Sequence, residues 1–390
     1  MEIAASRSRR PVLGRALTGL IGFFTLADLF ATQAILPSLA ARFQVSAAAI
    51  GVAANAGTIG MAIAGLLAGV LAGGVDRRRG IWMSLALLAL PTLLLSQAPN
   101  LWVFALLRVA QGLCMATAFT LTITYLAEQC APDEAAGSLA AYVTGVVASN
   151  LIGRLIAATV ASLAGTGASF MVFAGLNLAG ALLTRFALSG GAPMMMAAAG
   201  PFWTAWARHL RNPALLRAFA IGFLILFGFI GVFTYVGFVL ARPPYALSMA
   251  ALGLVFLCFA PSLITTPLAG RLGVALGRPL ALALTMLLAV AGLGLAAVAS
   301  LPTVIGGLAL IAVGTFLAQA LATASVGRNA PSDKAAASGL YLCAYYSGGL
   351  VGAIAVGRIF DAAGWHVALA VIGIAWLAAA AIGLGLRDAD

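Results

Sequence analysis

Three ionisable residues lie deep inside stretches of sequence that are otherwise apolar: Asp28, Arg108 and Arg154. An ionisable group near the centre of a membrane helix costs about 2.5 to 3.5 kcal/mol on insertion scales, so it usually faces a cavity or a partner. A carboxylic acid in such a place can take up and release a proton, and its proton affinity changes with hydration and with the distance to an arginine. We therefore predict proton coupling by Asp28 and Arg108. The alternative is a static ion pair that only fixes helix packing.

Polar side chains accompany these charges at helical spacing. Thr25, Asp28 and Thr32 fall three and four residues apart, which gathers them on one face of a helix. The helices that carry the two arginines have similar stripes, and we expect these faces to converge on one aqueous cleft. In the first half of the chain the predicted cleft-lining residues are Thr25, Thr32, Asn55, Gln111, Asn150 and Arg154.

In the second half of the chain, amide and aromatic residues predict a second wall of the cleft, opposite the charged one. This half has no ionisable residue as deep within a span as Asp28, Arg108 or Arg154. Gln319 lies on a polar helix face, and Tyr341 and Tyr345 stand one turn apart on the next helix. An aromatic and amide wall opposite a charged one suits an amphipathic ligand. For the tyrosines alone, ordinary helix packing is the simpler interpretation. The sequence indicates neither a metal site nor a cofactor motif.

The elements that must position these residues are membrane helices. The chain has 390 residues, of which 63% are hydrophobic and 8% charged, and this is too little polar surface for a soluble globule. A bilayer core about 30 Å thick requires roughly 20 apolar residues per helix. Dividing the sequence at its charged and Gly/Pro positions predicts twelve spans, at 16–39, 47–72, 81–97, 101–126, 138–163, 168–187, 214–240, 248–272, 280–300, 302–325, 337–360 and 366–386.

The basic residues predict how these spans are oriented. If the N-terminus is cytoplasmic, the outer loops hold only Arg42, Arg242 and Arg358, and the other loop arginines and the lysine fall on the inner side. The positive-inside rule expects such an asymmetry. It also accounts for the net charge of +11 without a nucleic-acid partner. We therefore predict a multi-pass protein with both termini in the cytoplasm.

The second half of the chain repeats features of the first. VSAAAIG at 45–51 recurs as LSMAALG at 247–253, and LAG at 67–69 recurs at 268–270. Two half-molecules that share a direction form the parallel repeat of a transporter that rocks about a central site. We predict six-helix bundles at 1–187 and 214–390, joined by a cytoplasmic linker at 188–213. The linker is expected to carry a short amphipathic helix at the headgroups or, as the alternative, to be a disordered connector.

A short motif of glycine and arginine follows the second predicted span. The sequence GVLAGGVDRRR at 69–79 resembles the motif between the second and third helices of the major facilitator superfamily, and GRLGVALGR at 270–278 echoes it. The resemblance implies a latch that holds one end of a transporter closed. The residues expected to form this gating latch are Gly69, Asp76, Arg77, Arg78, Arg79, Gly270, Gly277 and Arg278.

The motif departs from the family pattern at one important position. The family has an aspartate where this chain has Gly73, and Asp76 stands where a glycine is usual. Aspartate tolerates left-handed turn conformations better than most residues, so we expect Asp76 to supply the latch charge from the shifted position. The alternative is that the three arginines at 77–79 only determine topology.

Further segments resemble the same superfamily. LWVFALLRVAQG at 101–112 matches its fourth-helix pattern, and the segments at 233–248 and 326–349 are similar to bacterial efflux permeases of the drug:proton antiporter branch. The resemblance implies an all-α fold of twelve transmembrane helices in two pseudo-symmetric six-helix bundles. It also implies a monomer in the bacterial inner membrane that exports small amphipathic molecules in exchange for protons by alternating access.

Other functional classes fit the sequence less well. An enzyme is not expected, because the chain has no phosphate-binding loop, zinc-protease motif or nucleophile elbow. A receptor that does not transport is disfavoured by the repeat and the latch motif. The alternative within the transporter class is uniport or symport of a small organic anion or sugar. In that case Arg108 and Arg154 bind the substrate, because two membrane arginines against one carboxylate leave a surplus positive charge.

Overall fold

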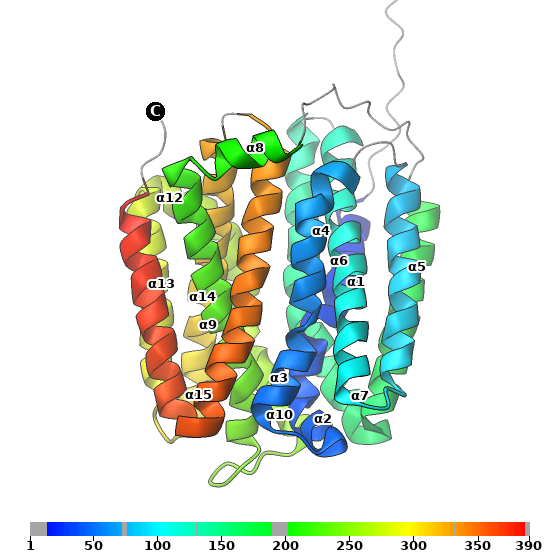
Figure 1. Cartoon of the computed structure of the whole chain (residues 1–390), viewed down its shortest axis with the longest axis vertical. Coiled ribbons are helices and arrows are strands. Elements are labelled where there is room, and N and C mark those ends of the chain that lie inside the picture. Colours follow the sequence, from blue (N-terminus) through cyan, green and yellow to red (C-terminus); the bar gives the residue numbers. More distant parts are fainter. Residues whose placement is uncertain (1–13, 72–75, 130–131, 189–201, 331, 387–390) are drawn as a thin grey trace, which may run out of the picture.

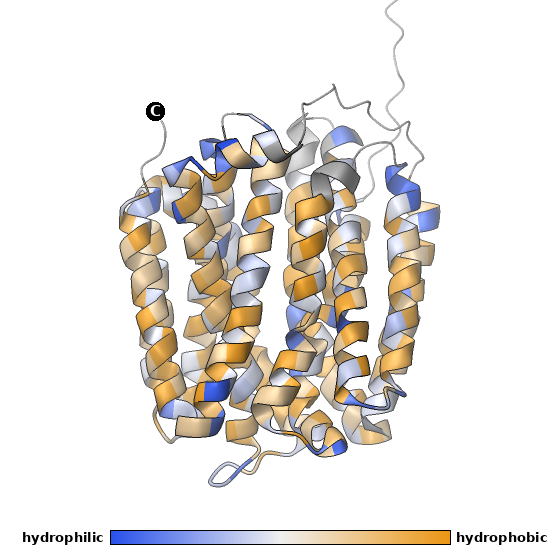
Figure 2. Cartoon of the chain, in the orientation of Figure 1, coloured by the Kyte–Doolittle hydropathy of each residue, from blue (hydrophilic) through white to orange (hydrophobic). Residues whose placement is uncertain are grey.

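The computed structural model describes residues 14–71, 76–129, 132–188, 202–330 and 332–386, and these residues form helices and connecting turns. Ten helical segments of this part are long and apolar enough to cross a membrane. Their surfaces are hydrophobic along most of their length, and hydrophilic residues gather at the two ends of the molecule (Figure 2). The predicted all-α membrane fold is therefore confirmed.

Two of the ten segments are double spans. Gly137–Ala187 and Lys334–Leu384 each run for 51 residues, and each is interrupted by one glycine with positive φ, at +86° for Gly165 and +80° for Gly364. Left-handed backbone of this kind favours glycine because it has no Cβ. Both glycines fall between pairs of spans that the sequence predicts. Counting each segment as two spans gives the twelve predicted crossings.

The N-terminal half contains the first six spans. Its helices pack α1 against α7, α4 against α6, and α5 against both α6 and α7. The elements are α1 (Arg15–Ala31), η1 (Thr32–Ile35), α2 (Leu36–Phe43), α3 (Ala47–Asn55), α4 (Gly57–Leu71), α5 (Arg77–Leu95), α6 (Leu101–Gln129) and α7 (Pro132–Ala187).

The C-terminal half repeats this arrangement, with α9 against α15 and α13 against α14 (Figure 1). Residues 189–201 of the predicted linker lie outside the described residues, and a short helix, α8, follows them. The elements are α8 (Phe202–His209), α9 (Pro213–Leu240), α10 (Met249–Val255), η2 (Phe256–Phe259), α11 (Ala260–Thr265), η3 (Thr266–Leu268), α12 (Ala269–Ala275), α13 (Arg278–Ala296), α14 (Leu301–Asn329) and α15 (Lys334–Leu384).

Three spans are broken within the membrane. The first passes through the 3-10 turn η1, the second is interrupted between α3 and α4, and the eighth contains η2 and η3. Pro37, Pro261 and Pro267 stand at the first positions of the pieces that follow. Proline has no backbone N–H to continue the helical pattern, and each break leaves carbonyl oxygens that need other donors.

The two halves contact each other at several levels of the molecule. At the end that holds α2, α3 and α10, α2 and α3 pack against α9, and α10 packs against α7. We call this the closed end. Helices α4 and α15 pack against each other as well. The opposite end, which carries α8 and the last residues of α15, we call the terminal end (Figure 1).

Candidate functional site

A central pocket lies between the two halves. It encloses about 480 Å³, counting the space at its mouth, and its walls come from α1, α7, α9, α14 and α15. Five aromatic rings, two of them from tyrosines, together with two amides and one threonine hydroxyl give it an amphipathic lining with no charged group. The lining residues are Leu26, Leu29, Phe30, Val146, Asn150, Ile225, Phe229, Thr315, Phe316, Gln319, Tyr345 and Tyr346.

Three residues of the predicted cleft line this pocket: Asn150, Gln319 and Tyr345. Tyr341 lies beside them, with its ring centroid 6.1 Å from that of Tyr345, and its hydroxyl accepts a hydrogen bond from Thr323. The sequence analysis missed the phenylalanines of the lining. In the sequence they look like any lipid-facing aromatic residue, and only the pairing of helices from the two halves brings them together.

Arg154 lies beneath the central pocket and is fully buried. Its Nη2 donates to Gln33 Oε1 at 2.6 Å, and its Nη1 donates to the backbone oxygen of Asn150 at 2.6 Å. Its guanidinium carbon lies 5.1 Å from the ring centroid of Phe30, which lines the pocket, and 4.5 Å from that of Phe259 in the other half.

The charge of Arg154 is not matched by an acid. Among the described residues no carboxylate comes within ion-pair distance of its guanidinium, and its Nε has no hydrogen-bond partner. Aromatic faces, including those of Phe256 and Phe233, surround it instead. Such rings attract a cation through their quadrupole. This arginine is therefore a buried positive charge at the boundary between the halves.

Asp28 belongs to a separate site inside the N-terminal half. Its Oδ2 accepts a hydrogen bond from Asn177 Nδ2 at 2.6 Å and a longer one from the Thr92 hydroxyl at 3.4 Å. Thr32 and Arg108 lie beside Asp28 together with residues of η1, α1 and α7, and these groups leave no space for a water molecule. The prediction of one cleft shared by Asp28 and the second half is wrong, because α1 turns Asp28 away from the central pocket.

Arg108 binds backbone rather than the carboxylate of Asp28. It donates to the carbonyl oxygens of Ala54, Asp28 and Leu29 at 2.8 to 3.1 Å. These oxygens lie where α1 passes into η1 and where α3 ends. In the described part of the chain no ion pair joins Arg108 to Asp28. The arginine therefore satisfies acceptors at two broken helices and fastens α6 to the first two spans.

An amide and hydroxyl network links Arg108 to the acid. Arg108 Nη1 donates to Gln111 Oε1 at 2.7 Å, and Gln111 Nε2 donates to the Thr92 hydroxyl at 2.6 Å. The sequence analysis missed Thr92 and Asn177. The signal was present, since each is a polar residue inside an otherwise apolar span. Five side chains thus form one buried polar cluster, Asp28, Thr92, Arg108, Gln111 and Asn177, which we call the acid cluster.

The remaining predicted cleft residues lie in three places. Thr32 lies beside Asp28 and Arg108. Thr25 is buried and donates to the backbone oxygen of Ile21. Asn55 joins the halves, because its Nδ2 donates to Thr234 of α9 at 3.0 Å, and Gln33 contacts the same hydroxyl at 3.4 Å. None of these three residues lines the central pocket.

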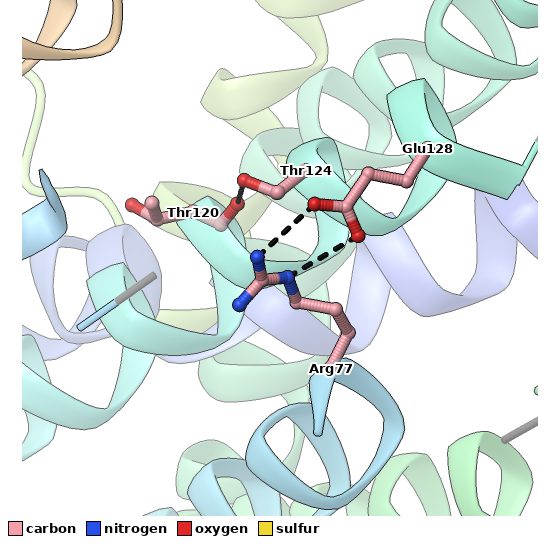
Figure 3. Close-up of polar contacts among 4 residues, drawn as sticks. All are labelled: Arg77, Thr120, Thr124 and Glu128. Atoms are coloured by element: carbon pink, nitrogen blue, oxygen red, sulfur yellow. Dashed lines mark hydrogen bonds and ion pairs between the residues drawn. The ribbon is translucent and has the colours of Figure 1, made fainter. Parts of the chain in front are cut away.

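Arg77 and Arg78 of the latch motif each bind a residue of the N-terminal half. Arg77 forms an ion pair with Glu128 of α6, with an Nη2 to Oε1 distance of 3.0 Å (Figure 3). Arg78 donates to the backbone oxygen of Arg185 in α7. Asp76 caps the N-terminus of α5, since its Oδ1 accepts from the backbone N–H of Arg79 at 2.7 Å. Asp76 therefore acts as a helix cap here, and its part in a latch stays a prediction.

The structure places the other latch residues in α4, in α12 and at the start of α13, and their part in a latch stays a prediction. Gly277 has a φ of +74° before α13, so the left-handed turn there requires glycine. Arg278 begins α13, and Gly270 lies in α12, where an added Cβ would have nothing within 4 Å. Gly69 lies within α4, and residues 72–75 of the motif are outside the described residues.

This architecture, with a pocket between two repeated bundles, defines a multi-pass membrane transporter. The family model of the Major Facilitator Superfamily matches residues 18–260, more than half of the chain. The chain belongs to the major facilitator superfamily, whose members are transporters and not enzymes.

Relatives by sequence span nearly the whole chain. The inner membrane transport protein YnfM of Escherichia coli is 27% identical over 368 residues, which cover 94% of this chain and 88% of YnfM. The uncharacterized MFS-type transporter YybF of Bacillus subtilis is 27% identical over 358 residues, which cover 90% of this chain and 87% of YybF. The names of these relatives do not mention drug:proton antiport, so the resemblance to that branch stays a prediction.

Solved structures share the fold at low sequence identity. A bacterial homolog of the human lysosomal transporter Spinster, in an inward-facing and unoccupied conformation, matches with a TM-score of 0.77 at 13% identity and covers 95% of this chain and 96% of its own. The nucleoside transporter NupG matches with a TM-score of 0.74 at 14% identity and covers 96% and 99%. At such identities the likeness shows the fold alone.

Proposed function

We propose that this protein moves a small amphipathic molecule across the bacterial inner membrane by alternating access and couples the movement to a proton carried by Asp28. The observation that carries the proposal is the double role of one stretch of α1. Leu29 and Phe30 line the central pocket, while Asp28 points into the acid cluster behind them. Substrate and proton therefore act on the same turn of the same helix.

The central pocket supports the choice of substrate. Its five aromatic rings offer apolar surface, and the amides of Asn150 and Gln319 together with the Thr315 hydroxyl offer a few convergent polar groups. This is the usual composition of a site for a small organic ligand. Because no acid lines the pocket, the substrate is neutral or anionic rather than a cation held by a carboxylate.

The acid cluster supports the coupling. Protonation of Asp28 removes a negative charge that Asn177 and Thr92 now solvate. Arg108 holds the carbonyl oxygens of Asp28 and Leu29, so a rearrangement of the cluster changes the position of the broken segment of α1. That segment contacts the other half through Phe30 and Phe229, whose ring centroids lie 5.6 Å apart. Coupling thus runs through α1 and not through direct competition in the pocket.

The direction of transport and the topology complete the proposal. We place the terminal end in the cytoplasm because the loop arginines and lysine gather there in the positive-inside sense. A monomer with export as its direction fits the resemblance to efflux permeases. Proteoliposomes with an imposed pH gradient test the transport itself.

Asp28→Asn is the variant that tests coupling. The amide keeps an acceptor oxygen for Asn177 but cannot release a proton. We expect uptake driven by the pH gradient to disappear while exchange of labelled for unlabelled substrate continues. Asp333→Asn, at the exposed start of α15, is the matched control and retains both activities. Gradient-driven transport that persists in Asp28→Asn rules out the proposed role of this acid.

A second candidate substrate class is supported by Arg154. A buried guanidinium without an acid partner, directly beneath the pocket, favours an organic anion with an aromatic body. One short match points the same way: the gentisate transporter of Corynebacterium glutamicum is 33% identical over 107 residues, 26% of this chain and 24% of that protein. If the substrate is an anion, Arg154→Gln abolishes its binding and spares that of a neutral analogue with the same ring.

A further inference from the structure

A second hollow, outside the transport pathway, opens at the terminal end of the N-terminal half. It encloses about 600 Å³, counting its open side, between the start of α5 and the end of α7. Its lining consists of Asp76, Arg78, Arg79, Trp82 and Arg185. We call it the arginine hollow.

The arginine hollow has more positive charge than its own groups neutralise. The single acid, Asp76, is engaged as the cap of α5. Arg78 is also engaged, because it donates to the backbone oxygen of Arg185 and so fastens α5 to α7. No described carboxylate pairs with the guanidinium of Arg79 or of Arg185. Two exposed guanidinium groups therefore face one hollow with no anionic partner among the described residues.

The indole ring of Trp82 lies against one of these two guanidinium groups. The guanidinium carbon of Arg185 lies 5.2 Å from the ring centroid of Trp82. Tryptophan is enriched at the level of the lipid headgroups because one end of its ring is apolar and the other polar. Trp82 thus marks the depth of the hollow as the headgroup region of the membrane.

The helix faces next to the hollow are apolar and open to the surroundings. Met83, four residues after Arg79 on α5, is 54% exposed, and Leu182, three residues before Arg185 on α7, is 56% exposed. Phe186 beside it is 78% exposed. Residues three and four apart share a helix face. A molecule with a charged end in the hollow can therefore lay apolar chains along the same two helices.

We propose that the arginine hollow binds the phosphate of an anionic phospholipid, with the acyl chains lying on the exposed faces of α5 and α7. Guanidinium groups bind phosphate oxygens through paired charge-assisted hydrogen bonds. Basic pockets between helices on the cytoplasmic side suit such headgroups. The adjoining apolar surface selects a lipid over a free phosphate ester, which has no chains to place there.

Binding of purified protein to lipids tests the proposal. Delipidated protein in a neutral detergent is titrated with phosphatidylglycerol, and separately with phosphatidylcholine of the same acyl chains, and bound lipid is counted by native mass spectrometry. We expect the anionic lipid to bind about 10-fold to 30-fold more tightly, the ratio expected for two arginines near a membrane surface. Glycerol phosphate, which has the phosphate but no chains, is the third probe and should not compete.

The variant that removes the two free charges is Arg79→Gln with Arg185→Gln. Arg78 is kept because it fastens the two helices. The preference for phosphatidylglycerol should fall to less than about threefold in the double variant, since most of the electrostatic attraction is lost. Arg271→Gln, an exposed arginine of α12 at the same end, is the matched control and should keep the full preference.

Two results overturn the proposal. The first is an undiminished preference in the double variant, which places the lipid elsewhere. The second is competition by glycerol phosphate at the concentrations that phosphatidylglycerol requires, which makes the hollow a site for a soluble phosphate ester. Thermal unfolding without added lipid shows whether the double variant is folded. Arg79→Gln alone is a second test, because it should lose about half of the preference for phosphatidylglycerol that the double variant loses.

Discussion

At the scale of single residues, the two buried arginines have different partners, although both stand as single charges inside apolar stretches of the sequence. Arg108 donates hydrogen bonds to backbone oxygens at two broken helices, so the dipoles of these carbonyl groups stabilise its charge. Arg154 has an unpartnered Nε and rests on aromatic faces. Hydropathy reveals how deep a charge lies, but the identity of its partners depends on which helices meet. The sequence offered proton coupling or a packing pair with Asp28 for Arg108, and neither interpretation identified the backbone oxygens as its partners.

Arg108→Ala should destabilise the protein strongly. It leaves the buried carbonyl oxygens of Ala54, Asp28 and Leu29 without this donor, and a buried unsatisfied polar group costs about 1 to 3 kcal/mol. We expect the apparent Tm of detergent-purified protein to fall by several degrees or the folded protein not to be recovered. Arg211→Ala, an exposed arginine, serves as the control. An unchanged Tm in Arg108→Ala contradicts the role described here.

At the scale of helices, glycine sets how closely some pairs approach. A Cβ added to Gly112 of α6 would lie 1.9 Å from the backbone oxygen of Gly57, at the start of α4, and one added to Gly145 of α7 would lie 1.8 Å from that of Gly19. Small residues at such crossings let backbones touch, which is a main source of packing energy in lipid. The contacts place the acid cluster, because α6 carries Arg108 and Gln111.

Gly112→Ala is therefore expected to separate α4 from α6 and to lower both stability and transport. Because the obstacle is backbone, it cannot be relieved by a side-chain rotation. Gly175→Ala provides the matched comparison, since Gly175 is also helical and has nothing within 4 Å of an added Cβ. The measurements are thermal unfolding and proteoliposome flux for both variants. Equal behaviour of the two variants argues against a close approach at Gly112.

The sequence predicts helices better than it predicts their interruptions. Long apolar runs located the spans because a bilayer requires them, and the prediction placed boundaries next to Gly165 and Gly364. It did not find η1, the break before Gly57 or the 3-10 turns of the eighth span. In the first two spans, Arg108 of another helix donates to backbone oxygens at the breaks. That compensation is a tertiary property and leaves little trace in local sequence.

At the scale of the whole molecule, the central pocket belongs to neither half alone. Phe30 comes from the first span, whereas Phe229 and Phe316 come from the other half. From the sequence, only polar residues inside apolar spans, such as Asn150 and Gln319, could be predicted to line the pocket. The contacts that join the two halves could not be predicted from the sequence either. They include Asn55 with Thr234 and the hydroxyl of Ser38 with the Met249 sulfur.

One contact at the closed end crosses between the halves and ends on a helix terminus. The Oδ2 of Asp361 in α15 accepts a hydrogen bond from the backbone N–H of Ala48, at the start of α3, at 3.2 Å. A carboxylate at a helix N-terminus satisfies a free N–H and interacts favourably with the helix dipole. Since α3 and α15 belong to different halves, this bond forms only while the closed end is closed.

Asp361→Ala should therefore shift the molecule toward the conformation that is open at the closed end. Loss of a capping interaction of about 1 kcal/mol changes the ratio of the two conformations about fivefold. The measurement is the distance distribution between spin labels at Ala41→Cys and Arg242→Cys, in a background with the native cysteines replaced by serine. Asp361→Asn, which keeps an acceptor oxygen, should give a smaller shift. If the distribution in Asp361→Ala matches that of the parent, the halves are held together by their apolar contacts and this cap contributes nothing to closure.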